Sequence, residues 1–583
     1  MTDHCTKRLL NAPETIVTDA LEGMIAAHPD LLALEGPTRR AVVAVDGPRE
    51  GKVGVVIGGG SGHEPAFAGY VGRGLADAAA VGNVFASPGP QQIMDAARAV
   101  DGGTGVLFLY GNYTGDVMNF DMAAEACQAE GIPARSVAVT DDVASAPAGR
   151  EGERRGIAGD FFVFKVAGAA ADAGRDLDGC VAAARAANAA TRSMGVALTP
   201  CSMPQTGRAH FDIAPDRMEI GMGIHGEPGM RSGPVGTADA VADELLGAIL
   251  DDLGLTAGDR VAVLVNGLGA TGQLELYVLN RRVAQILAAR GIATHRTWVG
   301  EYCTSLDMSG ASVTVMRLDE DLTRLLDHPC RTPALTVGSA VTAPATRRMP
   351  RVVRAPAVTT IAQDRDQLAT EGTVTPDVFR AMMLAAAQAI RAQRDWLSEL
   401  DGIIGDGDHG ITMEIGWTAI ARVMNEAPAD ETITQLCTRM SAAFLDAVGA
   451  STGPLYASAF HEAARAVADR LNLDGPAMAA WITGICDGIL SRGGARPGDK
   501  TMIDAWLPAA EAARAHDSDP SACLRAATAA AQEGRDRTAD IESRRGRSAK
   551  LGARSIGHID PGAASAHLVI SAMYQSLRPA SGI

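Results

Sequence analysis

The sequence predicts an α/β domain of two lobes followed by an all-α domain built as a helical bundle or barrel. Short apolar runs typical of buried strands alternate with helical patterns between about residues 40 and 330, which favours a mostly parallel sheet. Beyond residue 360 the apolar positions recur at helical spacing. A stretch rich in Pro, Thr, Ala and Arg lies between them. It predicts domains over 1–335 and 361–583, joined by a linker over 336–360.

Composition limits the class of protein. A net charge of −17 over 583 residues argues against nucleic acid as a partner, because binding a phosphate backbone needs a basic face. The nine cysteines are scattered, with no C-x-x-C pair and no zinc-type spacing, so we expect reduced cysteines and a cytoplasmic protein. No apolar leader and no apolar run of membrane-spanning length is present. We therefore expect neither export nor a membrane anchor.

The first strand pattern ends in a glycine-rich turn. The apolar run 53–57 leads directly into G-G-G-S-G-H-E-P at 58–65. A dinucleotide fingerprint fails here, because His63 stands where G-x-G-x-x-G needs its last glycine. The glycines instead predict a close backbone approach to something small and polar, with His63 beside it. The alternative is a histidine that only caps the following turn.

Two further polar residues follow strand patterns in the same region. Asp116 comes just after the apolar run 105–110, and His225 lies between glycines in the segment 218–229. A lone histidine in a loop rich in Gly and Pro is usually structural. Open α/β sheets, however, bind ligands beyond the carboxyl ends of their strands. The recurrence of His63, Asp116 and His225 at such positions therefore favours a functional role.

The second half contains an acidic, glycine-rich loop at the end of a helical pattern over 376–400. Asp401, Asp406 and Asp408 fall within eight residues, and glycines separate them. Mg²⁺ usually binds through a few carboxylates together with substrate phosphates, so these residues predict a metal–nucleotide site. His409 can donate to a phosphate oxygen. A solvated acidic turn is the alternative, and the EF-hand spacing is absent.

Helical spacing in the second half predicts about eight helices. Two segments of this half carry clustered glycines or basic residues. Gly493–Thr501 nearly spells a phosphate-binding P-loop, but Asp499 intrudes before the lysine and no strand precedes it, so we reject a Walker A motif. The basic run 535–554 is interleaved with acidic residues, which is typical of a solvated face. The expected helices are 377–400, 411–424, 432–447, 454–471, 477–491, 501–514, 520–533 and 563–577.

Several motifs resemble those of one family. Leu397–Gly410, with the pattern L-x-x-L-D-x-x-I-G-D-G-D-H-G, resembles the nucleotide-binding domain of the dihydroxyacetone kinase family. The segments 546–548 and 557–562 resemble that family's nucleotide lid. Tyr110-Gly111 and Ala450 depart from the family pattern, and the first departure leaves the exact sugar open. The segments that resemble the family's substrate domain are 58–65, 112–120, 141–144, 154–159, 191–200 and 221–229.

The resemblance implies roles for individual residues. His225 would bond covalently to the ketone carbon of the substrate, and Asp116 would act as base on the reacting hydroxyl. Gly60, Ser61 and His63 would hold the substrate, with His63 part of the catalytic set. Two Mg²⁺ ions on Asp401, Asp406 and Asp408 would bridge ATP phosphates. The remaining nucleotide contacts would come from His409, Ser451, Thr452, Arg547 and Asp560.

The expected activity is ATP-dependent phosphorylation of the terminal hydroxyl of a short ketose. Dihydroxyacetone is the first expectation, held as a hemiaminal on His225 in a homodimeric enzyme. A ketotetrose such as erythrulose is the main alternative, since one more hydroxymethyl group changes little that a sequence reveals. The others are cyclisation of FAD by the second domain and a silent sensor of ketose or nucleotide.

Overall fold

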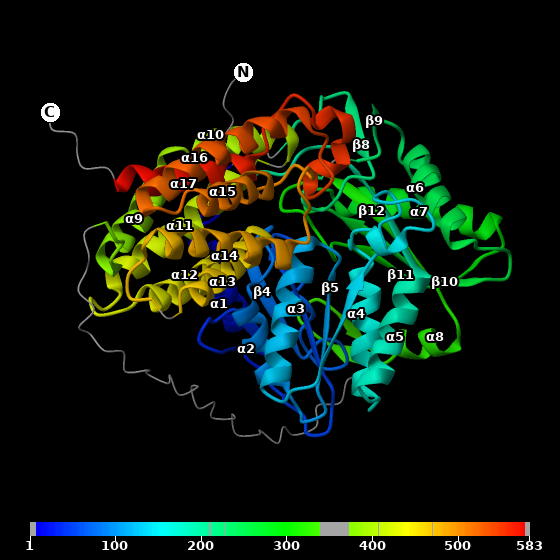
Figure 1. The fold of residues 1–583 in the computed structure, drawn as a ribbon. Helices are drawn as coiled ribbons and strands as arrows, with labels where there is room; N and C mark the ends of the chain where they lie inside the picture. The colour runs from blue at the N-terminus through cyan, green and yellow to red at the C-terminus, as the bar shows by residue number, and fades with distance from the viewer. Residues whose placement is uncertain are drawn as a thin grey trace. The chain divides into compact units, whose positions relative to one another are not determined.

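The chain forms two compact units, Met1–Pro350 and Arg351–Ile583 (Figure 1). The computed structural model describes residues 7–338 and 372–577, except for residues 208, 210, 228, 406 and 469 and the side chains of residues 547 and 550. Most of the expected linker lies outside these residues. The boundaries at 335 and 361 therefore stay predictions, and each unit is described by itself.

The first sheet of unit 1 has the strand order β1-β2-β4-β3-β5-β6. Strands β4, β3, β5 and β6 pair in parallel, whereas β1 and β2 add an antiparallel edge. Parallel neighbours need crossover connections, and α2 and α3 supply two of them. The bounds are β1 Leu32–Glu35, β2 Ala41–Ala44, β3 Gly54–Ser61, β4 Ala78–Val84, β5 Val106–Gly111, β6 Ala134–Val139, α1 Ile16–Ala27, α2 Pro90–Val100 and α3 Thr114–Ala129.

The second sheet has the order β11-β10-β12-β7-β8-β9, and only β10 and β11 pair in parallel among its described strands. The prediction of a mostly parallel sheet is therefore wrong for this lobe. The chain passes from β7 through β8 to β9 without an intervening helix, so it returns antiparallel. The bounds are β7 Thr191–Ala197, β8 Arg217–Ile220, β9 Arg231–Pro234, β10 Arg260–Gly267, β11 Ala293–Gly300, β12 Gly310–Arg317, α4 Asp160–Asp172, α5 Leu177–Ala190, α6 Ala238–Leu253, α7 Gln273–Ala289, α8 Glu320–Leu326, β13 Cys330–Arg331 and β14 Thr336–Val337.

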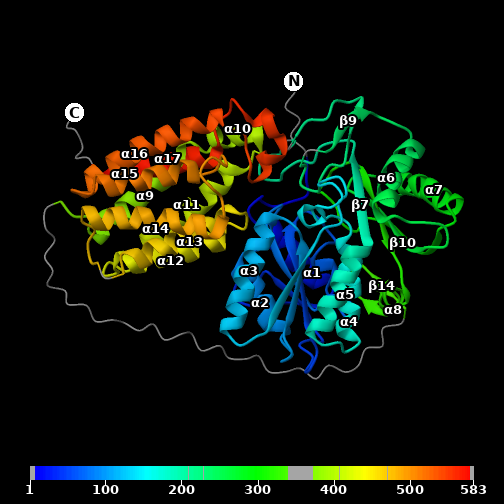
Figure 2. The same ribbon diagram turned by 45° about the vertical axis from the view of Figure 1, so that its right-hand side comes forward.

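Helices and sheets alternate as layers in unit 1 (Figure 2). Successive strand residues point to opposite faces, so Val56 packs towards α2 and α3, while Val55 and Ile57 pack towards α4 and α5. The same α4–α5 layer also covers the second sheet, where it meets Ala262 and Leu264. Helices α6 and α7 cover the other face of that sheet. The fold is thus the expected pair of α/β lobes, with one shared helical layer.

Unit 2 is a closed ring of helices with no strand among its described residues. In order around the ring, α9, α11, α12, α13, α14, α15, α16 and α17 each pack on the next, and α17 packs back on α9. The predicted helix 377–400 is in fact two helices, because the backbone turns out of helical geometry at Gln393. The bounds are α9 Pro376–Ala392, α10 Arg394–Ile404, α11 His409–Glu426, α12 Ile433–Ala447, α13 Thr452–Ala466, α14 Gly475–Gly493, α15 Ile503–Ala515, α16 Pro520–Arg537 and α17 Pro561–Ser576.

The direction of the helices in the ring determines which loops lie at the same end of the barrel. Short loops join most consecutive helices, so neighbours run in opposite directions. Helices α11, α13, α15 and α17 therefore begin at the same end of the barrel. Among the described residues, no helix combines the length and the apolar character needed to cross a membrane.

Candidate active site

His63 lies in the loop after β3, and its ring is held on three sides. Its Nδ1 lies 2.8 Å from the carbonyl oxygen of Thr304, and its Nε2 lies 3.0 Å from Nε2 of His225. The ring also stacks on Phe85, with centroids 5.0 Å apart. These contacts connect the ends of both sheets, so His63 does more than cap a turn.

His225 follows β8 and is oriented by a carboxylate that the sequence analysis missed. Its Nδ1 lies 3.1 Å from Oε1 of Glu227, and its backbone N–H donates to Oε2 of the same side chain at 3.0 Å. The edge of Tyr113 packs against the imidazole, with centroids 4.7 Å apart. The spacing H-G-E is visible in the sequence, but a carboxylate two residues away gives no sign by itself of which way it turns.

The hydrogen-bond partners fix where protons lie on the two imidazoles. A carbonyl and a carboxylate only accept, so Nδ1 carries the hydrogen in both His63 and His225. Both Nε2 atoms would then present lone pairs to each other, and the 3.0 Å contact requires one further proton between them. Burial, and next the neighbouring His225, lower the pKa of His63 to about 3. The imidazole of His63 is therefore neutral near neutral pH, and its Nε2 presents a lone pair towards His225.

Behind the pair lies a buried charge network. Arg155 lies 2.6 Å from Asp142, and its other terminal nitrogen lies 3.9 Å from Oε2 of Glu227. Burial opposes the charge on Arg155, but Asp142 and Glu227 raise its pKa overall. Because the guanidinium stays charged, it keeps Glu227 compensated while Glu227 faces His225.

Asp116 lies in the first turn of α3, beyond the carboxyl end of β5, as predicted. Its Oδ1 is buried and has no hydrogen-bond partner among the described residues. Burial raises the pKa of Asp116 to about 7, and a hydrogen bond from Ser87 acts against this shift. Ser87 and Phe85 are two residues apart in the loop after β4, so this loop contacts both Asp116 and His63. Such a carboxyl is suited to accept a proton near neutral pH.

The predicted glycine turn has a packing reason. A Cβ on Gly60 would lie 2.7 Å from the backbone nitrogen of Ala86, so a side chain there would displace the loop after β4. Ser61 is also engaged, since its hydroxyl donates to the carbonyl of Gly82 at 2.8 Å. The roles of Gly60 and Ser61 towards a substrate stay predictions.

In unit 2, the acidic loop joins α10 to α11. Oδ2 of Asp401 accepts hydrogen bonds from the backbone N–H groups of Asp408, at 3.0 Å, and His409, at 3.2 Å. Burial raises the pKa of Asp408 to about 7, and the charge of Asp401 adds to this shift. Two carboxylates held together in this way fit a divalent cation, whose charge would offset their repulsion. Asp406, the third predicted ligand, lies outside the described residues.

The loop also meets the start of α17. Nε2 of His409 lies 2.9 Å from the hydroxyl of Ser565, a residue that the sequence analysis missed. Asp560 caps α17 by accepting from the backbone N–H of Ala563 at 2.7 Å, and burial raises its pKa to about 7. The predicted nucleotide residues His409 and Asp560 therefore lie at neighbouring helix ends.

The three other predicted nucleotide residues lie at the starts of two elements. Ser451 and Thr452 stand at the first turn of α13, at the end of the barrel where α11 and α17 also begin. Helix N-termini present free backbone N–H groups, which suits phosphate. Arg547 begins a short 3₁₀ segment, Arg547–Ser555, and its side chain lies outside the description.

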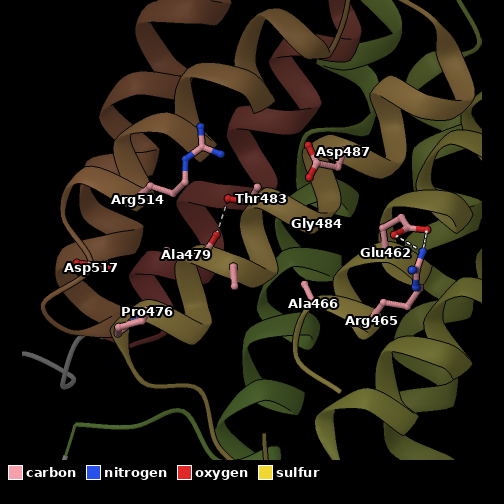
Figure 3. A pocket seen from close by; sticks show the side chains of 11 residues that line it. Glu462, Arg465, Ala466, Pro476, Ala479, Thr483, Gly484, Asp487, Arg514 and Asp517 are labelled. Atoms are coloured by element: carbon pink, nitrogen blue, oxygen red, sulfur yellow. Dashed lines mark hydrogen bonds and ion pairs between the residues drawn. The ribbon is translucent and has the colours of Figure 1, made fainter. Parts of the chain in front are cut away.

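A hollow of unit 2 lies away from the acidic loop. It measures about 560 Å³ and lies between the last turns of α13 and α15 and the first half of α14 (Figure 3). Arg465 pairs with Glu462 at its rim. This is the opposite end of the barrel from the acidic loop, so the hollow is not part of the predicted nucleotide site.

Comparison with known proteins accounts for both units. The Dak1 domain matches residues 22–334, and the DAK2 domain matches residues 403–575. The chain belongs to the dihydroxyacetone kinase family. It is a kinase of the fused Dak1–Dak2 type, a phosphotransferase with an alcohol group as acceptor, as the sequence motifs predicted. His63, Asp116 and His225 fall in the Dak1 match, and Asp408 falls in the DAK2 match.

Two full-length relatives of this Dak kinase are named for the sugar that they phosphorylate. It is 40% identical over 582 residues to the L-erythrulose 1-kinase of Mycolicibacterium smegmatis, which covers 98% of this chain and 99% of the relative. It is 40% identical over 570 residues to the D-erythrulose kinase of the same organism, with 96% of each chain covered. It also resembles the dihydroxyacetone kinase of C. freundii in complex with AMP-PNP and Mg²⁺, with a TM-score of 0.53 and 30% identity over 98% of this chain and 100% of that one.

Proposed function

We propose that this Dak kinase transfers the γ-phosphoryl group of Mg-ATP to a terminal hydroxyl of erythrulose. The observation that carries the sugar is the full-length similarity to two erythrulose kinases at 40% identity. It favours the four-carbon alternative of the sequence analysis over dihydroxyacetone. ATP and Mg²⁺ are supported by the related structure with AMP-PNP and Mg²⁺.

The His63–His225 pair is suited to fix a ketone. His225 Nε2 can attack the ketone carbon only with a free lone pair, and His63 Nε2, at 3.0 Å, is placed to accept the proton that blocks it. As the nitrogen–carbon bond forms, the carbonyl π bond breaks and the oxygen gains the electron pair. His63 then returns the proton to that oxygen. The product is a hemiaminal with a neutral hydroxyl, and the alkylated imidazole of His225 keeps its Nδ1 hydrogen and one positive charge opposite the Glu227 carboxylate. No other reactant is needed.

Asp116 then acts on the hydroxyl that receives phosphate. With a pKa of about 7, its carboxylate can take the hydroxyl proton near neutral pH as the oxygen attacks the γ-phosphorus. Its Oδ1 has no hydrogen-bond partner among the described residues, so it has a lone pair to offer a substrate hydroxyl.

The acidic loop of unit 2 would hold the metal. Asp401 and Asp408, with Asp406 from the sequence motif, would bind two Mg²⁺ ions against the ATP phosphates, where these ions neutralise charge during transfer. His409, Ser451, Thr452, Arg547 and Asp560 would hold the nucleotide. We also expect a homodimer, which light scattering of the purified protein would measure.

Initial rates of ATP consumption test the sugar directly. The purified enzyme is given L-erythrulose, D-erythrulose, dihydroxyacetone, glycerol or no acceptor, with a reaction that lacks enzyme as the control. We expect kcat/KM for one erythrulose enantiomer to exceed that for dihydroxyacetone, and no turnover of glycerol, which has no carbonyl. A higher kcat/KM for dihydroxyacetone than for either enantiomer would sink the four-carbon assignment.

A further inference from the structure

Lys500 is a buried residue just before α15, in the loop whose sequence nearly matches a P-loop motif. It lies at the end of the barrel where α11, α13, α15 and α17 begin. Its Nζ lies within hydrogen-bond distance of four backbone carbonyl oxygens: those of Thr538, Ile541, Ser555 and His558, at 2.8, 3.2, 2.6 and 2.6 Å. An ammonium group has three N–H donors and no acceptor. All three are therefore engaged by the protein backbone, and none is left for a phosphate.

The four carbonyls bracket one segment of chain. Thr538 lies just before it and Ile541 at its start, and Ser555 and His558 lie at its end. We call residues 541–558 the lid segment, after the family motif that it contains. One ammonium group thus ties together the two ends of the lid segment, which includes Arg547 and leads into Asp560.

Other contacts hold the lid segment against the same loop. The backbone N–H of Arg544 donates to the carbonyl of Asp499 at 3.1 Å, and the Arg545 guanidinium donates to the carbonyl of Gly494 at 2.8 Å. Within the lid segment, the N–H of Ser543 donates to the hydroxyl of Ser555 at 2.9 Å. The Ser543–Ser555 contact is buried like the ammonium group, whereas the contact of the Arg545 side chain is exposed.

The backbone conformation at Lys500 directs its ammonium group towards the four carbonyl oxygens. Lys500 has φ of 63°, in the left-handed region that disfavours residues with a Cβ. Asp504 braces the turn by accepting from the N–H groups of Gly498, at 2.6 Å, and Thr501, at 2.8 Å. Four converging carbonyls without a cation would be left buried and unpaired, which is costly. The turn and the lysine therefore act as one unit.

We propose that Lys500 is a positioning residue for the nucleotide: its ammonium group fixes the lid segment in the conformation that binds ATP, without contacting a phosphate itself. This inference rests on the proposed nucleotide site. In this proposal, the lysine of the rejected P-loop motif supports the nucleotide site from within the protein.

Amide hydrogen exchange of the nucleotide-free, full-length protein tests the proposal. In Lys500→Met, exchange in the lid segment should speed up by about 10–100-fold, because buried carbonyls left without a donor favour local opening, while α11 and α12 exchange as in the wild type. The KM for ATP should rise by a similar factor with a smaller change in kcat. Formation of the ketose adduct on His225, read by mass spectrometry, should not change.

Two further variants keep the result interpretable. Arg496→Met removes a positive charge from the exposed part of the same loop and should leave lid exchange unchanged. Lys500→Arg keeps a cation with N–H donors and should lie between wild type and Lys500→Met; it replaces Lys500→Met if that variant does not fold.

A lysine that binds phosphate would give the opposite pattern. Unchanged lid exchange in the nucleotide-free Lys500→Met or Lys500→Arg protein, with weakened ATP binding, would overturn the proposal. If the wild type turns over no ketose at all, the proposed function fails, but the exchange comparison still decides whether Lys500 anchors the lid segment.

Discussion

Nε2 of His63 lies 3.0 Å from Nε2 of His225, although the two residues are 162 positions apart and follow strands of different sheets. The outer nitrogens of both rings are engaged by acceptors, Thr304 and Glu227. The contact between the rings is therefore the only place on this pair where a proton must be shared. The proposed function uses this contact for the proton that must leave Nε2 of His225 before that nitrogen can attack a ketone.

His225→Ala should damage the choice of substrate more than the chemical step. A covalent adduct needs a carbonyl, whereas a hydrogen bond to a hydroxyl does not. We expect the adduct mass to disappear, KM for the ketose to rise, and part of kcat to remain at saturating ketose. The opposite result would be a variant that loses kcat while its KM is unchanged, together with a wild type that forms no adduct. It would mean that His225 acts in phosphoryl transfer instead.

Glu227→Gln tests the orientation of His225. The amide keeps the size of the side chain but can present N–H₂ to Nδ1, which would favour the wrong tautomer. We expect adduct formation to slow by about 10–100-fold, with ATP affinity unchanged. Stopped-flow or quenched mass spectrometry measures the rate. Glu219→Gln, on β8 nearby, is the matched control, and equal slowing in both variants would contradict the role of Glu227.

Asp116→Asn tests the proposed base through pH. Because the pKa of Asp116 is raised to about 7, wild-type kcat should rise with pH through about 7, and the variant should lose this limb along with about 10²–10⁴-fold in kcat. A variant that keeps both the limb and near-normal kcat would remove Asp116 from proton transfer.

The same shift predicts an effect on stability. A carboxyl whose folded-state pKa lies above its usual 3.8 binds its proton more tightly in the folded protein. Its stabilising contribution is complete below about pH 4 and is lost as pH rises through about 7. Asp116→Asn should therefore raise the melting temperature at pH 8 more than at pH 4, as calorimetry would measure.

Local patterns in the sequence were enough to predict the elements of the fold and the positions of His63, Asp116 and His225 at strand ends. Strand pairing across the second sheet was not, because the direction of β7, β8 and β9 depends on where long loops lead the chain. The break at Gln393 was missed for a related reason: apolar spacing continues across it, and a local turn leaves that pattern intact.

Partners that come from distant positions were also beyond the sequence. Thr304 contacts His63 across 241 positions, and Ser565 contacts His409 across 156. Lys500 was visible, but its role depends on four backbone carbonyls, which carry no side-chain signal. A motif can therefore indicate a charged residue without telling whether a ligand or the protein itself neutralises it.

Asp408→Asn tests how the acidic loop affects the stability of the protein without a metal ion and with Mg²⁺ bound. Burial and Asp401 raise the pKa of Asp408 to about 7, so the ionised pair opposes folding above that pH when no cation is present. In EDTA at pH 8, the variant should melt at a higher temperature than the wild type. Added Mg²⁺ should raise the melting temperature of the wild type by mass action and leave the variant nearly unchanged, because an amide is a weaker ligand. Mg-ATP turnover should be lost, while adduct formation on His225 persists.

Glu414→Gln, in α11 but outside the loop, provides the charge-matched control. If Mg²⁺ stabilised Asp408→Asn as much as the wild type, the acidic loop would not be the metal site.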